Sequence, residues 1–392
     1  MCGWLFVDST RVLGIGSFGR SLKGQNVTDQ IVRPSDAELH AYKAVHHAEY
    51  LRVTAKQAGG TNRLIHTTEL PTEGTDPVVT PALDHLYSKA VIDLTAGPVL
   101  VELPTVPRDR YFSIHVTDEE HYTIYDEVRP TGTYAFVRKG RGMQVPSDAT
   151  VIECPEDYPH LFIRVQLKSD EDKSNAMAIQ GQISLTGRSQ ELDFDDPIQF
   201  VLDTHDIYPQ NAGLLESVSD YSDEDHLRVE AFVNLRVRTI RNNIGAFGPI
   251  DSSEPGSDDP EIRAAAIIGH LGLPAEHAIY LPFFVNCDGA MLMGDQPEVF
   301  SFPYEPENVR EFWSVTRYSL LTRNTLPGLN DIYNAYNTVP DGGGNVTVTF
   351  SAADPNDGTY WMPVIAGEPY YFIVRLYGPD LDALPPGPCD RK

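Results

Sequence analysis

The sequence lacks two features that define familiar protein classes, clustered cysteines and a long hydrophobic run. Its four cysteines lie far apart and form no C-x-x-C pair, at Cys2, Cys154, Cys287 and Cys389. Neither a zinc knuckle nor a disulfide scaffold is therefore expected. A membrane helix needs about 20 predominantly apolar residues. The nearest segment, residues 264–284, is interrupted by His270, Pro274, Glu276 and His277. We therefore expect no membrane partner.

Positive charge is also scarce. The 392 residues include 30 Lys and Arg against 56 Asp and Glu, a formal net charge of −26. Such a surface would repel a phosphate backbone, so no nucleic-acid partner is expected. The apolar fraction of 41% and the charged fraction of 22% are those of a soluble globular protein. The length predicts two or three domains of about 150 residues each.

The N-terminus lacks the features of a leader peptide. Residues 1–20 have no basic segment ahead of their apolar residues and no clear cleavage site. We therefore expect no signal peptide and, by default, a cytoplasmic location, with secretion left open. Gly14, Gly16 and Gly19 spell G-x-G-x-x-G, but no kinase lysine, H-R-D loop or D-F-G follows. Residues 1–32 are predicted to form an irregular extension.

Short alternating segments predict that the first half of the chain is mostly β. Residues 90–94 and 98–103 are apolar and separated by Ala96-Gly97, while residues 111–117 alternate polar and apolar side chains. This pattern favours an antiparallel meander. Turn residues separate four further expected strands, at 122–128, 133–138, 150–154 and 161–167.

Three segments have helical features. Residues 36–58 follow a capping box of Ser35 and Glu38 and end at two glycines. Their apolar positions are sparse, so we expect this helix on the surface of the β domain. Apolar residues recur at helical spacing over 229–240, and Asp259-Pro260 begins a short helix that stops near Gly272. Strands are then expected again at 278–281, 298–302, 312–318, 345–351 and 371–377.

These patterns predict a mainly β fold with helical insertions, built from two antiparallel β-sandwich domains joined through a helical segment. The expected boundaries are 33–203 for the N-terminal sandwich with its leading helix, 204–272 for the connecting helices and 273–392 for the C-terminal sandwich. The two β regions resemble each other. Residues 111–116, YFSIHV, are similar to residues 312–317, FWSVTR. Residues 159–165, PHLFIRV, are similar to residues 369–375, PYYFIVR. Chance similarity between strands is the alternative.

Several motifs resemble those of a known family. Residues 79–88, VTPALDHLYS, and 109–113, DRYFS, are similar to the V-x-T-P-N-x-D-T-L-Y-S and D-R-Y-x-S motifs of the domain of unknown function numbered 1254. Residues 312–316, FWSVT, and 374–379, VRLYGP, resemble the F-W-S-x-T and L-R-L-Y-x-P motifs of its partner domain, numbered 1214. The sequence departs from the pattern at Ala82, usually Asn, and at His85, usually Thr. The resemblance implies paired jelly-roll-like β-sandwiches and no settled reaction.

Polar side chains from residue 84 onward supply groups for acid–base chemistry. Asp84, Tyr87 and His115 are the candidate catalytic residues, as a carboxylate, a phenol and an imidazole. The candidate substrate-binding residues in this half are Arg110, Tyr111, Arg129 and Arg164, since guanidinium groups present a planar donor fork to carboxylates. We expect Asp84, Tyr87, Arg110, His115 and Arg164 to line one pocket. In the structural alternative, Asp84 caps a turn and pairs with Arg110 to brace the fold.

The second β region offers an aromatic platform beside a charge. Trp313 and Arg375, accompanied by Trp361, Tyr371 and Tyr377, would suit a sugar or another polar ring, although aromatic residues at strand spacing are more often part of a core. Seven of the twelve histidines lie in the first third of the chain, without a strong metal-ligand spacing. The acidic segments 193–196 and 220–225 do not match a calcium-binding loop. No cofactor is predicted, and a bound divalent metal is the less favoured alternative.

Three classes of function remain open at this point. The first is an enzyme acting on a polar, carbohydrate-like or carboxylated small molecule, in a pocket of the N-terminal domain or between the two sandwiches. The second is a ligand-binding protein without turnover. The third is a structural, capsid-like assembly of jelly rolls, which would be a homo-oligomer.

Overall fold

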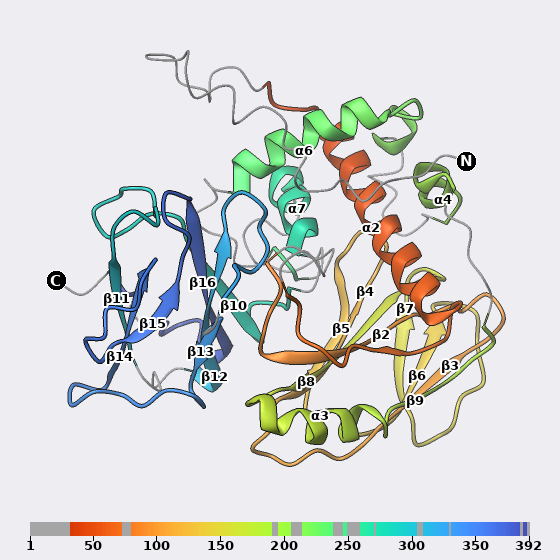
Figure 1. The fold of residues 1–392 in the computed structure, drawn as a ribbon. Coiled ribbons are helices and arrows are strands. Elements are labelled where there is room, and N and C mark those ends of the chain that lie inside the picture. Colours follow the sequence, from red (N-terminus) through yellow and green to blue (C-terminus); the bar gives the residue numbers. More distant parts are fainter. Residues whose placement is uncertain are drawn as a thin grey trace.

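A computed structural model describes residues 32–72, 80–189, 195–204, 214–237, 246–248, 259–269, 272–303, 309–328, 331–384 and 387–389 (Figure 1). The glycine pattern at residues 14–19, the predicted extension up to residue 31 and the predicted helix beyond residue 237 lie outside these ranges. The protein is mainly β, with helices grouped beside the two β regions (Figure 1). Among the described residues, every helix is too short or too polar to cross a membrane.

The N-terminal β unit is a sandwich of two sheets. One sheet has the order β1-β2-β8-β4-β5 and the other the order β7-β6-β3-β9. Its strands are β1 Ile65–His66, β2 His85–Val91, β3 Val99–Leu103, β4 Phe112–Thr117, β5 Thr123–Val128, β6 Gly132–Arg138, β7 Thr150–Cys154, β8 His160–Gln166 and β9 Ser184–Thr186. Side chains of both sheets, among them Leu86, Ile114, Phe136 and Ile163, form an apolar core. Alternation along each strand places every second residue in this core.

The expected meander is wrong. Strands β2 and β3 lie in different sheets, and β2 is hydrogen-bonded to β1 and β8 instead. The first strand also begins earlier than expected, at His85 and not at residue 90. Alternation reports that a segment is a strand, but the partner is chosen by packing between sheets, which a local pattern does not encode.

The C-terminal β unit is a second sandwich, with sheet orders β10-β16-β12-β13 and β11-β14-β15. Its strands are β10 Ala278–Phe283, β11 Glu298–Pro303, β12 Val309–Ser319, β13 Ile332–Asn334, β14 Asn345–Ser351, β15 Tyr360–Pro363 and β16 Tyr370–Pro379. Phe300, Val315, Phe350 and Phe372 are central to its core. Two edge pairs, β6 with β7 and β14 with β15, are parallel, so the sandwiches are not purely antiparallel as expected.

The two units repeat one topology. Four pairings of the first unit recur in the second. In the first sheet of each unit, β2 pairs with β8 and β4 with β8, as β10 pairs with β16 and β12 with β16. In the other sheet, β3 pairs with β6 and β6 with β7, as β11 pairs with β14 and β14 with β15. The predicted relation between the β regions therefore has a structural counterpart. The alignment of PHLFIRV with PYYFIVR is out by one residue, because Ser113 pairs with Arg164 where Ser314 pairs with Arg375.

Helices α2, α4, α6 and α7 group together on one side of the N-terminal sandwich, and α3 lies apart from them at its other end (Figure 1). They are α2 Asp36–Ala58, α3 Lys173–Gln180, α4 Pro197–Thr204, α6 Asp223–Val237 and α7 Pro260–Ala266, with 3-10 turns η3 Asp170–Asp172 and η4 Ile267–Gly269. The capping box of Ser35 and Glu38 is present, and Gly59 ends α2 in a left-handed conformation. As expected, α2 lies on the outside of the β domain, where it packs on β2. It is not exposed there, however, because α4, α6 and α7 flank it.

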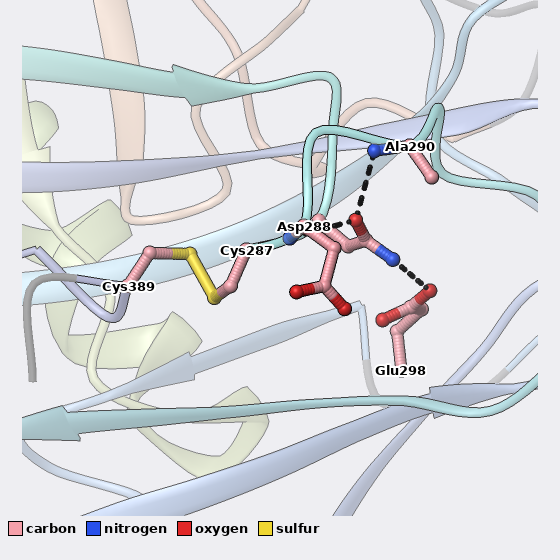
Figure 2. The surroundings of a disulfide bond; sticks show 6 residues. Cys287, Asp288, Ala290, Glu298 and Cys389 are labelled. Carbon is pink, nitrogen blue, oxygen red and sulfur yellow. Dashed lines mark hydrogen bonds between the residues drawn. A yellow bond between two sulfur atoms is a disulfide. The ribbon is translucent and has the colours of Figure 1, made fainter. Parts of the chain in front are cut away.

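A disulfide joins Cys287, which follows β10, to Cys389 near the C-terminus, with Cα atoms 5.2 Å apart (Figure 2). The turn that carries Cys287 is held by Asn286, whose side-chain oxygen accepts hydrogen bonds from the backbone of Asp288 and Ala290 and whose amide donates to Glu298. This pair was not evident from the sequence, because the two cysteines are 102 residues apart. Only folding of the whole C-terminal sandwich brings them together.

Candidate functional site

The outer faces of two sheets, one from each sandwich, meet between the units. In β2, β8 and β4 the residues Leu86, Ile163 and Ile114 enter the core, so their neighbours Tyr87, Arg164 and Ser113 point out of it. In β10, β16 and β12 the same alternation turns Tyr280, Arg375 and Ser314 outward, since Ile279, Val374 and Val315 are in the core. All six outward residues except Tyr280 are buried, which shows that these faces are covered.

Side chains cross directly between the two faces. Ser314 Oγ donates to Asp84 Oδ2 at 2.8 Å, and the hydroxyl of Tyr318 donates to the carbonyl of Pro81 at 2.6 Å. Arg375 donates to the carbonyl of Thr80 at 3.0 Å. The interface therefore contains buried hydrogen bonds between the units beside a cluster of aromatic and apolar side chains that includes Tyr111 and Phe312.

Each face carries the same row of residue types across three strands. Tyr87 pairs with Arg164, which pairs on its other side with Ser113. In the second unit Tyr280 pairs with Arg375, which pairs with Ser314. We call these the first and the second Tyr–Arg–Ser row. Asp84, His85 and the two rows together form what we call the interdomain site.

The two guanidinium groups act on common neighbours. Both Arg164 and Arg375 lower the pKa of His85 and oppose the rise that burial causes in the pKa values of Tyr87 and Tyr280. The two charges therefore both lie close to one set of rings. Each arginine is only 2% exposed, and arginine stays protonated even when buried.

His85 occupies a cage of aromatic rings. Its ring centroid lies 5.2 Å from that of Tyr377 and 5.3 Å from that of Tyr111. Burial, followed by the fields of Arg164 and Arg375, lowers the pKa of His85 well below its usual value, so the imidazole is neutral. Within the described ranges neither of its ring nitrogens has a hydrogen-bond partner. A buried polar group left in this state costs about 1–3 kcal/mol, which a bound hydrogen-bonding molecule would recover.

Asp84 is the carboxyl group of the site. It is 1% exposed, and burial raises its pKa, although Arg375 and the hydrogen bond from Ser314 oppose the rise. Its side chain also accepts from Tyr377 at 3.3 Å. A carboxyl group with a raised pKa can exchange a proton closer to neutral pH than an exposed aspartate can.

The segment leading to Asp84 is strained. Thr80 has a φ of 56°, a left-handed conformation that β-branched residues rarely adopt. Its carbonyl accepts from Arg375, and its hydroxyl lies 2.5 Å from that of Tyr371. Such strain persists only where surrounding contacts hold it, and it is concentrated at functional sites.

Comparison with known proteins assigns the two halves of this site. Residues 61–187 match the family described as protein of unknown function (DUF1254), and residues 277–381 match the family described as protein of unknown function (DUF1214). The chain pairs a DUF1254 domain with a DUF1214 domain. The resemblance found in the motifs is thereby confirmed, and no curated protein matches the chain. The DUF1254 domain supplies the first Tyr–Arg–Ser row and the DUF1214 domain the second.

Two solved structures are similar. The VPA0106 protein from Vibrio parahaemolyticus is 21% identical, with a TM-score of 0.67 over 88% of this chain and 94% of the other. At that identity the likeness shows the fold alone. A putative uncharacterized protein from Burkholderia cenocepacia is 13% identical, with a TM-score of 0.49 over 87% of this chain and 84% of the other.

Most of the predicted site residues meet at the interface between the DUF1254 and DUF1214 domains. Asp84, Tyr87, Arg164 and Arg375 belong to the interdomain site, and the ring of Tyr111 packs beside that of His85. His115 lies on the same face as Ser113, its neighbour on that face of β4, and its pair with Phe162 is two residue pairs along the strands from the pair of Ser113 with Arg164. There its Nε2 is 3.0 Å from Thr123 Oγ1.

Three predicted residues lie elsewhere. Arg110 forms two hydrogen bonds of 2.6 Å with Asp172, so it neither lines the interdomain site nor pairs with Asp84 as the structural alternative proposed. Arg129 forms an ion pair with Glu311. Trp313 is in the core of the DUF1214 domain, stacked on Phe302. Its indole therefore does not reach the site.

Sequence reasoning did not select His85, Tyr280 or Ser314. For His85 a sign was available, since it departs from the family motif and shares strand parity with Tyr87. Tyr280 and Ser314 show no local sign, because their role depends on the other domain. Some of the buried histidines do gather beside α2: the ring of His47, on this helix, lies 5.7 Å from that of His121 and 6.5 Å from that of His160. Within the described part of the chain, no three His, Cys, Asp or Glu side chains are arranged to hold a metal ion.

Proposed function

We propose that the protein is an enzyme that acts on a carboxylated, carbohydrate-like small molecule bound between its DUF1254 and DUF1214 domains. The observation that carries this proposal is the pair of buried guanidinium groups, Arg164 and Arg375, whose fields both act on a neutral histidine, His85; the ring nitrogens of His85 have no hydrogen-bond partner in the described residues. Ligand sites favour domain interfaces, and guanidinium groups bind carboxylates in a bidentate geometry.

The remaining groups suit a polyhydroxylated molecule. The phenols of Tyr87, Tyr280 and Tyr377 provide hydroxyl groups that both donate and accept hydrogen bonds. Aromatic rings next to them present flat apolar surfaces of the kind on which a sugar ring packs. The site therefore supplies hydrogen bonds for hydroxyl groups and positive charge for an acid.

Proton transfer is the chemistry that these groups support. Neutral His85 accepts a proton from the substrate. Asp84, whose pKa is raised by burial, exchanges a proton with the part of the substrate that lies near Arg375. A general base and a general acid held in different environments are the usual elements of acid–base catalysis. Because both residues are buried, substrate entry requires the two domains to separate at this interface.

Calorimetric titration tests binding, and product analysis tests turnover. The unmodified protein is expected to bind sugar acids such as gluconate or glucuronate more tightly than glucose, and to convert at least one of them. Arg164→Gln should weaken binding by about 10- to 100-fold, the amount expected for loss of a charge-assisted hydrogen-bonded pair. The matched control is Arg141→Gln, since Arg141 pairs with Asp157 on the surface, and it should bind normally.

Two outcomes separate the alternatives. Binding without conversion would make the protein a ligand-binding protein and overturn its assignment as an enzyme. Equal binding of acids and neutral sugars, or an Arg164→Gln variant that binds as well as the unmodified protein, would overturn the assignment of the site.

A further inference from the structure

The segment that leads into β2 belongs to the DUF1254 domain, but several of its polar groups bind the DUF1214 domain. We call residues 80–84 the strap. The backbone N–H of Thr80 donates to the carbonyl of Arg323 at 2.7 Å, and the carbonyl of Thr80 accepts from Arg375 at 3.0 Å. The hydroxyl of Thr80 lies 2.5 Å from that of Tyr371. All three polar groups of Thr80 are therefore bound by the other domain.

The contacts continue along the strap to one of the proposed acid–base groups. The hydroxyl of Tyr318, which is fully buried, donates to the carbonyl of Pro81 at 2.6 Å. At the end of the strap Ser314 Oγ donates to Asp84 Oδ2 at 2.8 Å. The DUF1214 domain thus holds the segment that carries Asp84.

The closed position of the strap is strained. Thr80 has a φ of 56° and Arg323 a φ of 61°, and the hydrogen bond across the interface joins the backbones of these two residues. A left-handed backbone is unfavourable for residues other than glycine, most of all for a β-branched one. The contacts of the strap therefore hold it against a strain that its release would relieve.

The interface is held differently beside β5. Arg129 follows β5 and has a φ of 59°, but its guanidinium group binds both carboxylate oxygens of Glu311 in β12. Asp126 of β5 forms a second pair with His277, which precedes β10. Bidentate, charge-assisted pairs are roughly twice as strong as hydrogen bonds between neutral groups. In the sheet order β4 and β8 separate β5 from β2, so the charged pairs and the strap lie on either side of these two strands.

We infer that the strap is a latch for the interdomain site, which opens on the strap side while the charged pairs at β5 hold the two domains together. The inference builds on the proposed function, because a buried site must open to admit its substrate. Return of the strap brings Asp84 back to Ser314 and Arg375. Tyr318 and Tyr371 are then positioning residues, since their hydroxyl groups hold the strap and do not contact the substrate.

Hydrogen exchange followed by mass spectrometry tests the latch without any ligand. The measured quantity is the protection of the Thr80 amide, whose hydrogen bond crosses the interface, relative to an unfolded peptide. Tyr318→Phe and Tyr371→Phe should each lower this protection by about 3- to 10-fold, because each removes one hydrogen bond from the closed state. Protection of β6 and β14, in the two sandwich cores, should not change. Tyr333→Phe is the matched control, since the Tyr333 hydroxyl donates to the carbonyl of Trp361 within the DUF1214 domain, and it should leave the strap unaffected.

A double variant separates the strain from the lost contacts. In Tyr371→Phe the partner of the Thr80 hydroxyl is already absent. Adding Thr80→Asn supplies a residue that tolerates the left-handed conformation, so the protection of the strap should rise again by about threefold or more. Melting temperatures identify any variant that is misfolded, and Tyr371→Phe alone carries the test if Tyr318→Phe is misfolded.

Arg129→Gln shows whether the two sides of the interface are independent. It should leave the protection of the strap unchanged, because Arg129 acts beside β5. Equal loss of protection in Arg129→Gln and Tyr318→Phe would mean that the interface opens as a whole. Unchanged protection in both tyrosine variants would mean that these hydroxyl groups do not hold the strap. Either result overturns the latch.

Binding kinetics distinguish failure of the latch from failure of the proposed function. With gluconate as the probe, Tyr318→Phe should raise the association and dissociation rate constants by about 3- to 10-fold in stopped-flow measurements, since both steps require opening. Unchanged rate constants with normal binding would contradict the role of the strap in substrate entry. If neither gluconate nor glucuronate binds the unmodified protein, the proposed function fails, and the exchange measurements alone decide whether the strap opens.

Discussion

Asp84 shows how burial and partners oppose each other at a single residue. Its carboxyl group is removed from water, which raises its pKa, while Arg375 and Ser314 stabilise the charged form and limit that rise. The net result is a group that prefers its proton more in the folded chain than in the unfolded one. The protein therefore carries a charge at the interface at some cost to its stability, as functional sites commonly do.

Asp84→Asn should therefore raise the melting temperature at neutral pH. Because the folded-state pKa of Asp84 is above the unfolded value, the folded chain binds more protons through that interval and loses stability as the pH rises through it. The difference in melting temperature between the variant and the unmodified protein should be largest above the folded-state pKa of Asp84. It should shrink as the pH falls towards about 4. Melting curves between pH 4 and 8 measure it. A variant that melts lower than the unmodified protein at pH 8 would mean that Asp84 braces the interface.

Arg110 should behave as a structural residue. Its partner Asp172 has a pKa lowered to about 2, because hydrogen bonds from Arg110 and from the backbone of Lys168 outweigh the effect of burial. This stabilisation is present above pH 4 and is lost as the pH falls through the folded-state pKa. Since Asp172 is partly solvated, we expect Arg110→Ala to cost about 1–2 kcal/mol and to leave ligand binding unchanged. Urea titration measures the loss, and Arg141→Ala, which breaks an exposed pair, should cost less than about 1 kcal/mol.

Helix α2 buries polar side chains against the sandwich. His40, Lys43 and His47 are all less than 9% exposed, and Lys43 forms an ion pair with Glu120 in the turn between β4 and β5. Burial and the charge of Lys43 lower the pKa of His47 to about 3. Burial also lowers the pKa values of His121 and His160 well below the usual value, and His47 contributes to both shifts.

These neutral histidines should make the fold sensitive to mild acid. Their folded-state pKa values are below the unfolded value of about 6.5, so the unfolded chain takes up protons first and stability falls as the pH drops below that value. At pH 5 the loss is about 2 kcal/mol for each histidine that stays neutral in the folded chain. Urea titrations at pH 7 and pH 5 measure it. His47→Gln should flatten this dependence. His66 is only half-buried, and burial lowers its pKa as well, so replacing it should flatten the dependence less than His47→Gln does. An equal slope in both variants would contradict the assignment to α2.

At the scale of elements the sequence predicted the pieces better than their arrangement. Alternation and turn residues located most long strands, and the capping box of Ser35 and Glu38 located α2 with its correct ends. The pairing of β2 with β8 was missed, because the alternation of residues in a strand identifies its two faces but not the strand that pairs with it. Short elements such as β9 and β13 were missed as well, since three residues carry too little periodicity.

The candidate site was only half predictable for a related reason. Asp84, Tyr87 and Arg164 could be selected because the family motif and strand parity place them together in one domain. Their counterparts Tyr280 and Ser314 are ordinary strand residues until the second domain is packed against the first. A register shift of one residue turns a side chain to the opposite face, so only the strand pairing shows that Arg375 is the counterpart of Arg164.

The whole molecule consists of two related sandwiches, but only the second is closed by a covalent bond. Cys287 and Cys389 bracket the DUF1214 domain, since the first follows β10 and the second follows β16. In the DUF1254 domain the described cysteine, Cys154, is buried as a free thiol in the sandwich core. The two domains should therefore respond differently to a reducing agent.

Reduction should weaken the DUF1214 domain and leave the DUF1254 domain nearly unchanged. A cross-link over about 100 residues restricts the unfolded chain and stabilises the folded one by about 4–5 kcal/mol in the chain-entropy account. We expect dithiothreitol, or the variant Cys287→Ser with Cys389→Ser, to lower the melting temperature and to speed hydrogen exchange in β10–β16 but not in the strands of the first sandwich. Cys154→Ser is the matched control and should not change the response to the reducing agent. If exchange accelerates equally in both sandwiches, the interdomain contacts of Asp84 and Arg375 make the protein one cooperative unit. If it accelerates in neither, the C-terminal segment contributes nothing to the stability of the domain it closes.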